Sequence, residues 1–152
     1  MGIFETFRLL LSPRNRLLKR LAATAADAEN LAANLRRHAQ MCTYPTIRDR
    51  LEELCESAAT QANEMRELLL GNGVWPQLPS APVHEGANNW ERLRNDLTAA
   101  VAILRALRSQ FAEWASIDPP LAERLRELAS RADRQVERIR DLALKCDPQA
   151  LD

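Results

Sequence analysis

Apolar residues recur at steps of three and four along four long segments of the chain, and no other sequence feature limits the fold as strongly. Such steps place side chains on one face of an α-helix. In the first segment the pattern runs through Leu18, Leu21, Ala25, Ala28, Ala32, Leu35, Ala39 and Cys42. In the third it runs through Trp90, Leu93, Leu97, Ala100, Leu104, Leu107, Phe111 and Trp114. Helices with one apolar stripe each bury those stripes by packing side by side, so we predict an all-α four-helix bundle.

Capping residues, prolines and glycines predict where these helices begin and end. Ser12-Pro13 and Asp118-Pro119 each place a capping side chain before a proline at the first helical position. Gly71-Asn72-Gly73 is typical of a helix C-terminus. We therefore predict helices over residues 13–40, 45–70, 89–115 and 119–146, preceded by a short amphipathic helix within residues 1–12.

The lengths of the connections predict how the helices are joined. Few residues separate the first two helices or the last two, so residues 13–70 and 88–147 should each form an antiparallel hairpin. The 16 residues from Gly71 to Gly86 reach about 53 Å when extended, whereas a helix of about 25 residues is about 38 Å long. The connection over residues 71–87 can therefore cross the bundle lengthwise within a single domain, residues 1–152.

This connection is rich in proline and also carries three apolar residues, Trp75, Leu78 and Val83. Burial of one large apolar side chain contributes roughly 1.5–3 kcal/mol, and proline lowers the entropy that ordering must overcome. We expect the connection to pack against the bundle, and Trp75→Ala to cost more than about 1 kcal/mol.

The layout, together with the helix segments LEELCE (Leu51–Glu56) and LRELAS (Leu125–Ser130), resembles the ferritin-like superfamily, nearest to its rubrerythrin-type members. The resemblance covers residues 14–146. It implies a di-metal carboxylate site in the core, with Glu-x-x-His on the second and fourth helices and one Glu on each of the other two. The second and fourth helices also align with each other at an offset of 74 residues.

The positions that the resemblance assigns to metal ligands hold other residues. The two Glu-x-x-His positions read Ala58-x-x-Gln61 and Ala132-x-x-Gln135, and the first and third helices present Ala25, Ala28, Leu97 and Ala100. Alanine has no ligating atom and glutamine offers a neutral carbonyl, so we predict that the metal site is lost and that no cofactor binds.

The two glutamines on the apolar stripes carry a further expectation. An unpaired buried amide costs about 1–3 kcal/mol, so Gln61 and Gln135 should bond each other, a backbone carbonyl or a trapped water. If they share one site, replacing both with Leu should cost less than replacing Gln61 alone.

A shifted metal site would use Glu29, Glu64 and Asp96. Glu29 and Asp96 lie one position off the apolar stripes, where charged side chains usually face solvent, so we expect them at the rim or the surface. His38 lies near a helix C-terminus, where a basic group suits the helix dipole, and we expect this role rather than that of a metal ligand. His84 is expected in a surface loop.

Charge and targeting features reduce the number of functional classes that fit this chain. The 21 basic and 21 acidic residues give no support for a protein that mainly binds nucleic acid, and no phosphate loop or nucleophile motif is found. We expect no secretory leader and no membrane span, and three scattered cysteines favour reduced thiols in a cytoplasm. The 19 arginines among the 21 basic residues suit a GC-rich bacterial coding sequence. A basic cluster, Arg14, Arg16, Lys19 and Arg20, is a candidate patch for an anion or a membrane surface.

These observations predict a metal-free, non-catalytic ferritin-like bundle that acts as a protein-interaction or scaffold module, as a homodimer or with another protein partner. One alternative is a ferritin-like oxidoreductase or storage protein with the shifted site. A second is a membrane-surface module that docks through residues 2–20. Metal content and liposome binding would distinguish the three.

Overall fold

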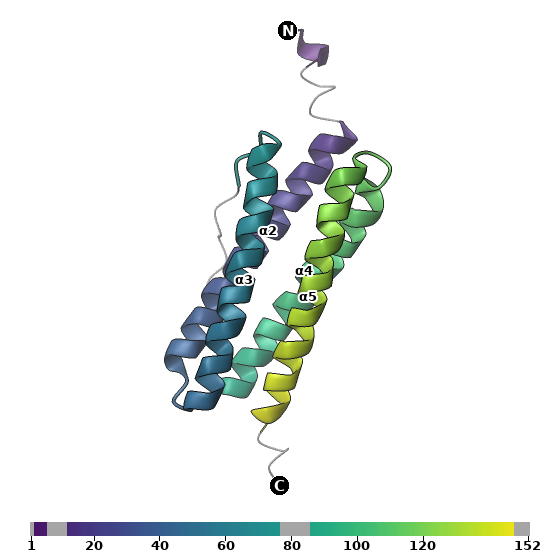
Figure 1. Cartoon of the computed structure of the whole chain (residues 1–152). Coiled ribbons are helices and arrows are strands. Elements are labelled where there is room, and N and C mark those ends of the chain that lie inside the picture. The colour runs from purple at the N-terminus through teal and green to yellow at the C-terminus, as the bar shows by residue number, and fades with distance from the viewer. Residues whose placement is uncertain (1, 6–11, 77–85, 148–152) are drawn as a thin grey trace.

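The computed structural model describes residues 2–5, 12–76 and 86–147. Within them the chain forms four long helices and no strand (Figure 1): α2 (Pro13–Met41), α3 (Pro45–Gly71), α4 (Asn89–Trp114) and α5 (Pro119–Lys145). Residues 3–5 add a short N-terminal helical turn. The predicted bounds of all four long helices are confirmed to within one residue. None of these helices combines the length and apolar character needed to cross a membrane.

The helix termini form through local chemistry that the sequence already displays. The N-caps Ser12, Asn88 and Asp118 each accept a hydrogen bond from the backbone N–H three residues later, at 2.9 to 3.2 Å. Proline occupies the start of α2, α3 and α5. After α3, Gly73 has a φ of 74°, a conformation that glycine adopts at little cost.

The helices pack as two antiparallel hairpins, as the connection lengths predicted. The hairpin partners α2 and α3 pack together, as do α4 and α5, while α2 also packs against α4 and α3 against α5. Figure 1 shows α3 ending at one end of the bundle and α4 beginning at the other. All four helices contribute to one continuous apolar core.

The core follows the predicted stripes, with one systematic difference in α4. All eight residues predicted for the stripe of the first helix are buried. In α4, however, Leu97 and Phe111 are only partly buried, whereas the neighbouring polar residues Asp96 and Gln110 are 1% and 2% exposed. The inward face of α4 is thus displaced by one residue at these two steps. Both polar side chains have polar partners on α2, which allows their burial.

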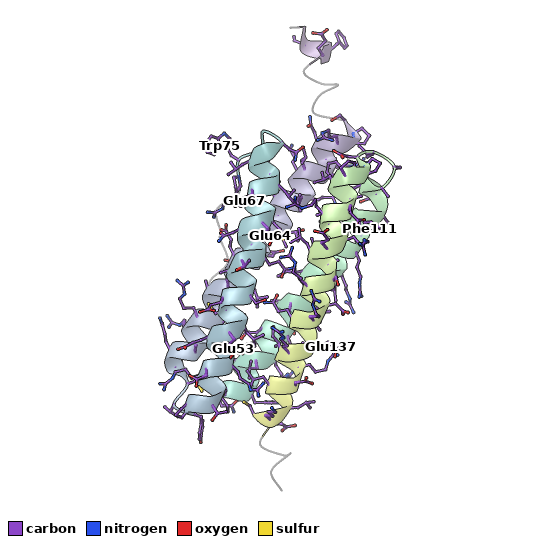
Figure 2. All side chains as sticks on the ribbon, viewed as in Figure 1. Glu53, Glu64, Glu67, Trp75, Phe111 and Glu137 are labelled. Atoms are coloured by element: carbon purple, nitrogen blue, oxygen red, sulfur yellow. The ribbon has the colours of Figure 1, made fainter. Side chains whose placement is uncertain are left out.

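Trp75 does not pack against the bundle, so this expectation was wrong. The residue is 85% exposed, and Figure 2 shows it projecting outward beside the C-terminal end of α3. The chain closes α3 with hydrogen bonds from Gly73 N to Leu70 O and from Val74 N to Leu69 O. Val74 supplies the apolar contact of this turn, which leaves Trp75 in solvent. Leu78, Val83 and His84 lie outside the described residues.

Candidate functional site

The interface between α2 and α4 contains a buried imidazole–carboxylate contact. His38, near the end of α2, places Nδ1 2.5 Å from Oδ2 of Asp96, near the start of α4, and both side chains are 2% exposed. The expectation that Asp96 lies at the rim or the surface was therefore wrong, and His38, expected to act on the helix dipole, is buried against a carboxylate. Burial is tolerable for both groups because each supplies a hydrogen-bonding or ionic partner that replaces lost water.

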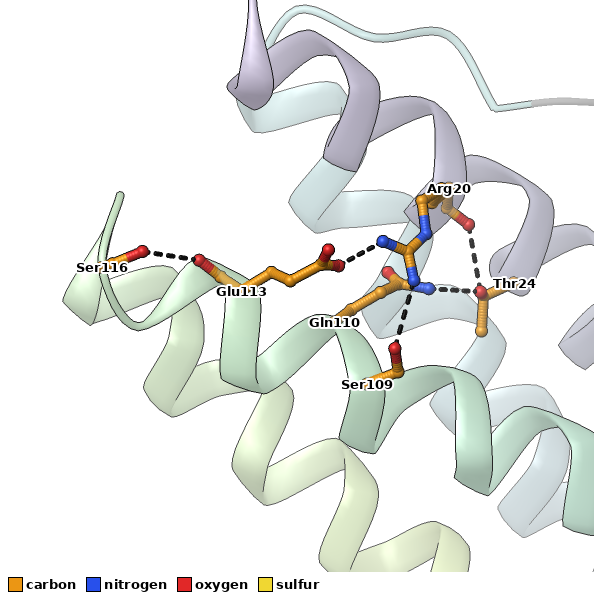
Figure 3. A network of polar contacts seen from close by, with 6 residues as sticks. All are labelled: Arg20, Thr24, Ser109, Gln110, Glu113 and Ser116. Atoms are coloured by element: carbon orange, nitrogen blue, oxygen red, sulfur yellow. Dashed lines mark hydrogen bonds and ion pairs between the residues drawn. The ribbon is translucent and has the colours of Figure 1, made fainter.

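A second polar contact joins the same two helices nearer their other ends (Figure 3). Gln110 Nε2 donates to Thr24 Oγ1 at 2.9 Å, and Thr24 Oγ1 donates to the backbone oxygen of Arg20 at 3.0 Å. At the surface edge, Arg20 contacts Glu113 and donates to Ser109 Oγ at 3.2 Å. Polar side chains of α2 and α4 are thus matched to each other at two levels of the bundle.

The interface between α3 and α5 uses a different arrangement, in which amides bond to backbone. Gln61 Nε2 donates to the carbonyl oxygen of Leu128 at 2.9 Å, and Gln135 Nε2 donates to that of Leu54 at 3.4 Å. The 74-residue offset that relates the glutamines also relates their acceptors, so the two contacts are reciprocal. Both glutamines are buried. Each glutamine was expected to bond the other glutamine, a backbone carbonyl or a water, and each bonds a backbone carbonyl.

The three carboxylates of the shifted metal site lie in three different interfaces. Glu29 of α2 contacts Arg66 of α3, Glu64 of α3 contacts Arg131 of α5, and Asp96 lies against the imidazole described above. The Arg131 guanidinium donates to Glu64 at 2.5 Å and holds the pKa of that carboxyl below its ordinary value. No group of three or more metal-ligating side chains occurs in the described part of the chain. The structure does not bring the three together.

The residues of the core do not fit the two-metal site that the fold family implies. Ala58 and Ala132 are buried and have no ligating atom. Among residues 2–5, 12–76 and 86–147, Asp96 is the one buried carboxylate. A single negative charge leaves most of the charge of two divalent cations uncompensated in a medium of low dielectric constant.

Two of the four side chains in the basic cluster near the start of α2 contact other helices of the bundle. Arg14 forms an ion pair with Asp118 at 2.9 Å, and its guanidinium holds the pKa of that carboxyl below its ordinary value. Arg20 is held at the α2–α4 edge, as described above. Arg16 and Lys19 are exposed. Two of the four predicted side chains therefore face solvent.

Sequence reasoning missed the His38–Asp96 contact, although a signal for it exists. Asp96 and Gln110 belong to a second series on α4 whose steps of three and four are as regular as those of the apolar stripe. That series runs through Leu93, Asp96, Ala100, Ile103, Leu107, Gln110 and Trp114, and all seven residues are buried. At the two steps where the series differ in polarity, the predicted stripe contains the apolar neighbours, Leu97 and Phe111.

Comparison with known proteins establishes the fold. No protein-family model matches the chain, and no curated protein matches it. The structure is similar to the crystal structure of an archaeal Dps homologue from Halobacterium salinarum, with a TM-score of 0.77, 21% sequence identity, and coverage of 86% of this chain and 81% of that one. The predicted ferritin-like four-helix bundle is therefore confirmed as a fold.

Proposed function

We propose that this ferritin-like bundle is a metal-free, non-catalytic module for protein interaction or scaffolding. One observation carries the proposal: each carboxylate that could form a shifted metal site lies against its own basic partner in a separate interface. These groups act as links between helices. They are not gathered around a common point, as the ligands of a metal ion must be.

Recruiting these carboxylates to a metal would be costly. Moving Glu29 and Glu64 inward breaks two ion pairs and leaves Arg66 and Arg131 without their present partners. The inward-facing residues at the implied ligand positions, Ala58 and Ala132 among them, would also have to be displaced. The cation would have to compensate both effects, and the donors near it would still be few.

We propose a homodimer or a complex with another protein partner in the cytoplasm, with the chain as one domain. Large apolar side chains at the end of the bundle where α3 begins and α5 terminates support a contact surface there. Tyr44 and Leu144 are 63% and 59% exposed, and exposed apolar groups favour protein contacts. The balance of charges supports a protein partner over nucleic acid.

Elemental analysis tests the metal-free proposal. Protein from iron-supplemented cells should contain well under one iron per chain, and added Fe(II) or Mn(II) should leave the melting temperature unchanged. The Glu29→Gln/Glu64→Gln variant is the matched control, because it removes two ligands of the shifted site. Two metals per chain in the native protein, lost in this variant, would overturn the proposal in favour of the storage or oxidoreductase alternative, which the fold likeness to the Dps homologue supports.

Light scattering tests the oligomer, and sedimentation tests the membrane alternative. A homodimer has twice the 17.2 kDa mass of one chain, and its mass should hold on dilution to micromolar concentrations. Full-length chain and a variant without residues 2–12 should both stay in the supernatant with anionic liposomes. Pelleting of the full chain alone would favour the membrane-surface module.

A further inference from the structure

A cleft of about 250 Å³ lies on the surface between α3 and α5. Its floor contains Leu54 and Leu142, which are 4% and 3% exposed. Three cations, Arg50, Arg138 and Lys145, and two carboxylates, Glu53 and Asp141, line its rim. Glu53, labelled in Figure 2, lies on the half of α3 nearest the end where α5 terminates. The cleft adjoins the contact between Gln135 and the Leu54 carbonyl, since Leu54 belongs to both, but it has no part in the proposed function.

The charged side chains of this rim make no ion pair or side-chain hydrogen bond with any other described residue. This sets the cleft apart from the rest of the same interface, where Glu64 and Arg131 bridge α3 and α5. It also differs from the outer face of α5, where Glu123 pairs with Arg126 and Glu137 with Arg140 at a spacing of three residues. The rim groups are therefore available to a bound molecule.

Residue order accounts for part of this difference. The pairs on the outer face of α5 place the acid before the base, whereas both rim arginines precede their acid, Arg50 before Glu53 and Arg138 before Asp141. Within the rim, Asp141 before Lys145 is the one acid-first spacing. The acid-first order is the more favourable one on a helix, because it agrees with the helix dipole. The rim arginines thus gain less from pairing along their own helices and can extend over the cleft.

We propose that the cleft binds a small organic anion with one carboxylate and an apolar body. A guanidinium from each of two facing helices suits a carboxylate, since arginine forms paired hydrogen bonds with both of its oxygens. Leu54 and Leu142 offer an apolar floor to the rest of the molecule. The net charge of the rim is one positive unit, so Glu53 and Asp141 disfavour polyphosphates and other multiply charged anions.

A titration followed by ¹H–¹⁵N NMR tests this inference on the full chain. Phenylacetate and 4-methylpentanoate each carry one carboxylate and an apolar body. At least one of them should produce saturable shifts confined to residues 50–54 and 138–145. Acetate lacks the apolar body and benzyl alcohol lacks the charge, so each should bind at least about tenfold more weakly than the better probe.

Two matched variants make the outcome specific. Arg50→Gln/Arg138→Gln should weaken binding of the better probe at least about tenfold. Arg126→Gln/Arg140→Gln removes the same charge from the outer face of α5 and should leave binding unchanged, and both variants should melt as the native chain does. Absence of saturable shifts with both probes, equal binding of acetate, or equal weakening by the two variants would overturn the inference.

Discussion

The α2–α4 and α3–α5 interfaces both bury polar side chains, but these side chains contact different kinds of partner. Between α2 and α4, one side chain meets another: His38 meets Asp96, and Gln110 bonds Thr24. Between α3 and α5, each buried glutamine bonds a backbone carbonyl of the facing helix. A contact between α2 and α4 requires two particular side chains, whereas a contact between α3 and α5 requires only one.

The difference determines what a substitution leaves behind. Loss of one member of a side-chain pair removes a polar contact from the other member, which stays buried. A carbonyl inside a helix already accepts the N–H four residues later, so loss of a glutamine removes one bond and strands no acceptor. We therefore expect α2–α4 to be the interface that tolerates less change.

Removal of Asp96 should have the largest effect. Asp96→Ala should lower the free energy of unfolding by about 3–5 kcal/mol, because it takes away the carboxylate that lies against the buried imidazole of His38. The double variant His38→Leu/Asp96→Leu should recover most of the loss, since an apolar pair often replaces a buried ionic pair without cost. Urea denaturation measures both. A loss below about 1 kcal/mol for Asp96→Ala would mean that the pair behaves like a surface contact.

The glutamines should cost less and act independently. Gln61→Leu and Gln135→Leu should each lower stability by no more than about 1 kcal/mol, and their effects should add to within about 0.5 kcal/mol. This differs from the expectation for two glutamines bonded to each other, in which the double variant is better than Gln61→Leu. Denaturation of the two single variants and the double variant decides between them, and a strongly compensating double variant would refute the reciprocal carbonyl contacts.

The Glu64–Arg131 bridge between α3 and α5 should contribute up to about 1 kcal/mol, and only above acidic pH. Its hydrogen bond lowers the pKa of Glu64 in the folded state. A lowered pKa stabilises the fold above the ordinary pKa of the group, and this contribution disappears as the pH falls through the folded value. Glu64→Gln should be less stable than the native chain at neutral pH, and the gap should close as the pH falls through the lowered pKa of Glu64. Glu67→Gln, an exposed change on the same helix, controls for loss of charge, and a gap that does not narrow with falling pH would argue against the bridge.

Trp75 lies in neither interface and should have the smallest effect. Trp75→Ala should change the free energy of unfolding by less than about 0.5 kcal/mol, because the side chain is 85% exposed. Trp114 is 0% exposed, and the matched change Trp114→Ala should cost about 3–5 kcal/mol. Thermal denaturation compares the two. A loss above about 1 kcal/mol for Trp75→Ala would restore the expectation that the connection packs against the bundle.

The helices and their order could be predicted because the signals are local. A cap such as Ser12 or Asp118 acts on a backbone N–H three residues away, and the helix period repeats within four residues. The burial of Gln61 and Gln135 was predictable for the same reason, because each stands at an unambiguous step of its stripe. These features need no knowledge of the neighbouring helix.

The inward face of α4 was not predictable in this way. At two steps an apolar and a polar residue stand side by side, Leu97 beside Asp96 and Phe111 beside Gln110, and hydrophobicity alone selects the apolar one. The polar residue is buried in both cases because α2 supplies a polar partner for it. Even the nearer of these partners in sequence, His38, is 58 residues from Asp96. Trp75 shows the converse, since an apolar side chain stays exposed where the closing turn of α3 directs it into solvent.

The sequence by itself therefore determined the bounds and order of the four long helices and the hairpin topology. Only the tertiary structure decided which polar residues enter the core, which carboxylate meets which base, and which charged groups around the α3–α5 cleft are left unpaired by the rest of the described chain. The reason is physical. Helix formation depends on contacts a few residues apart, whereas the free energy of burying a polar or charged group depends on a partner that the fold brings from far along the chain.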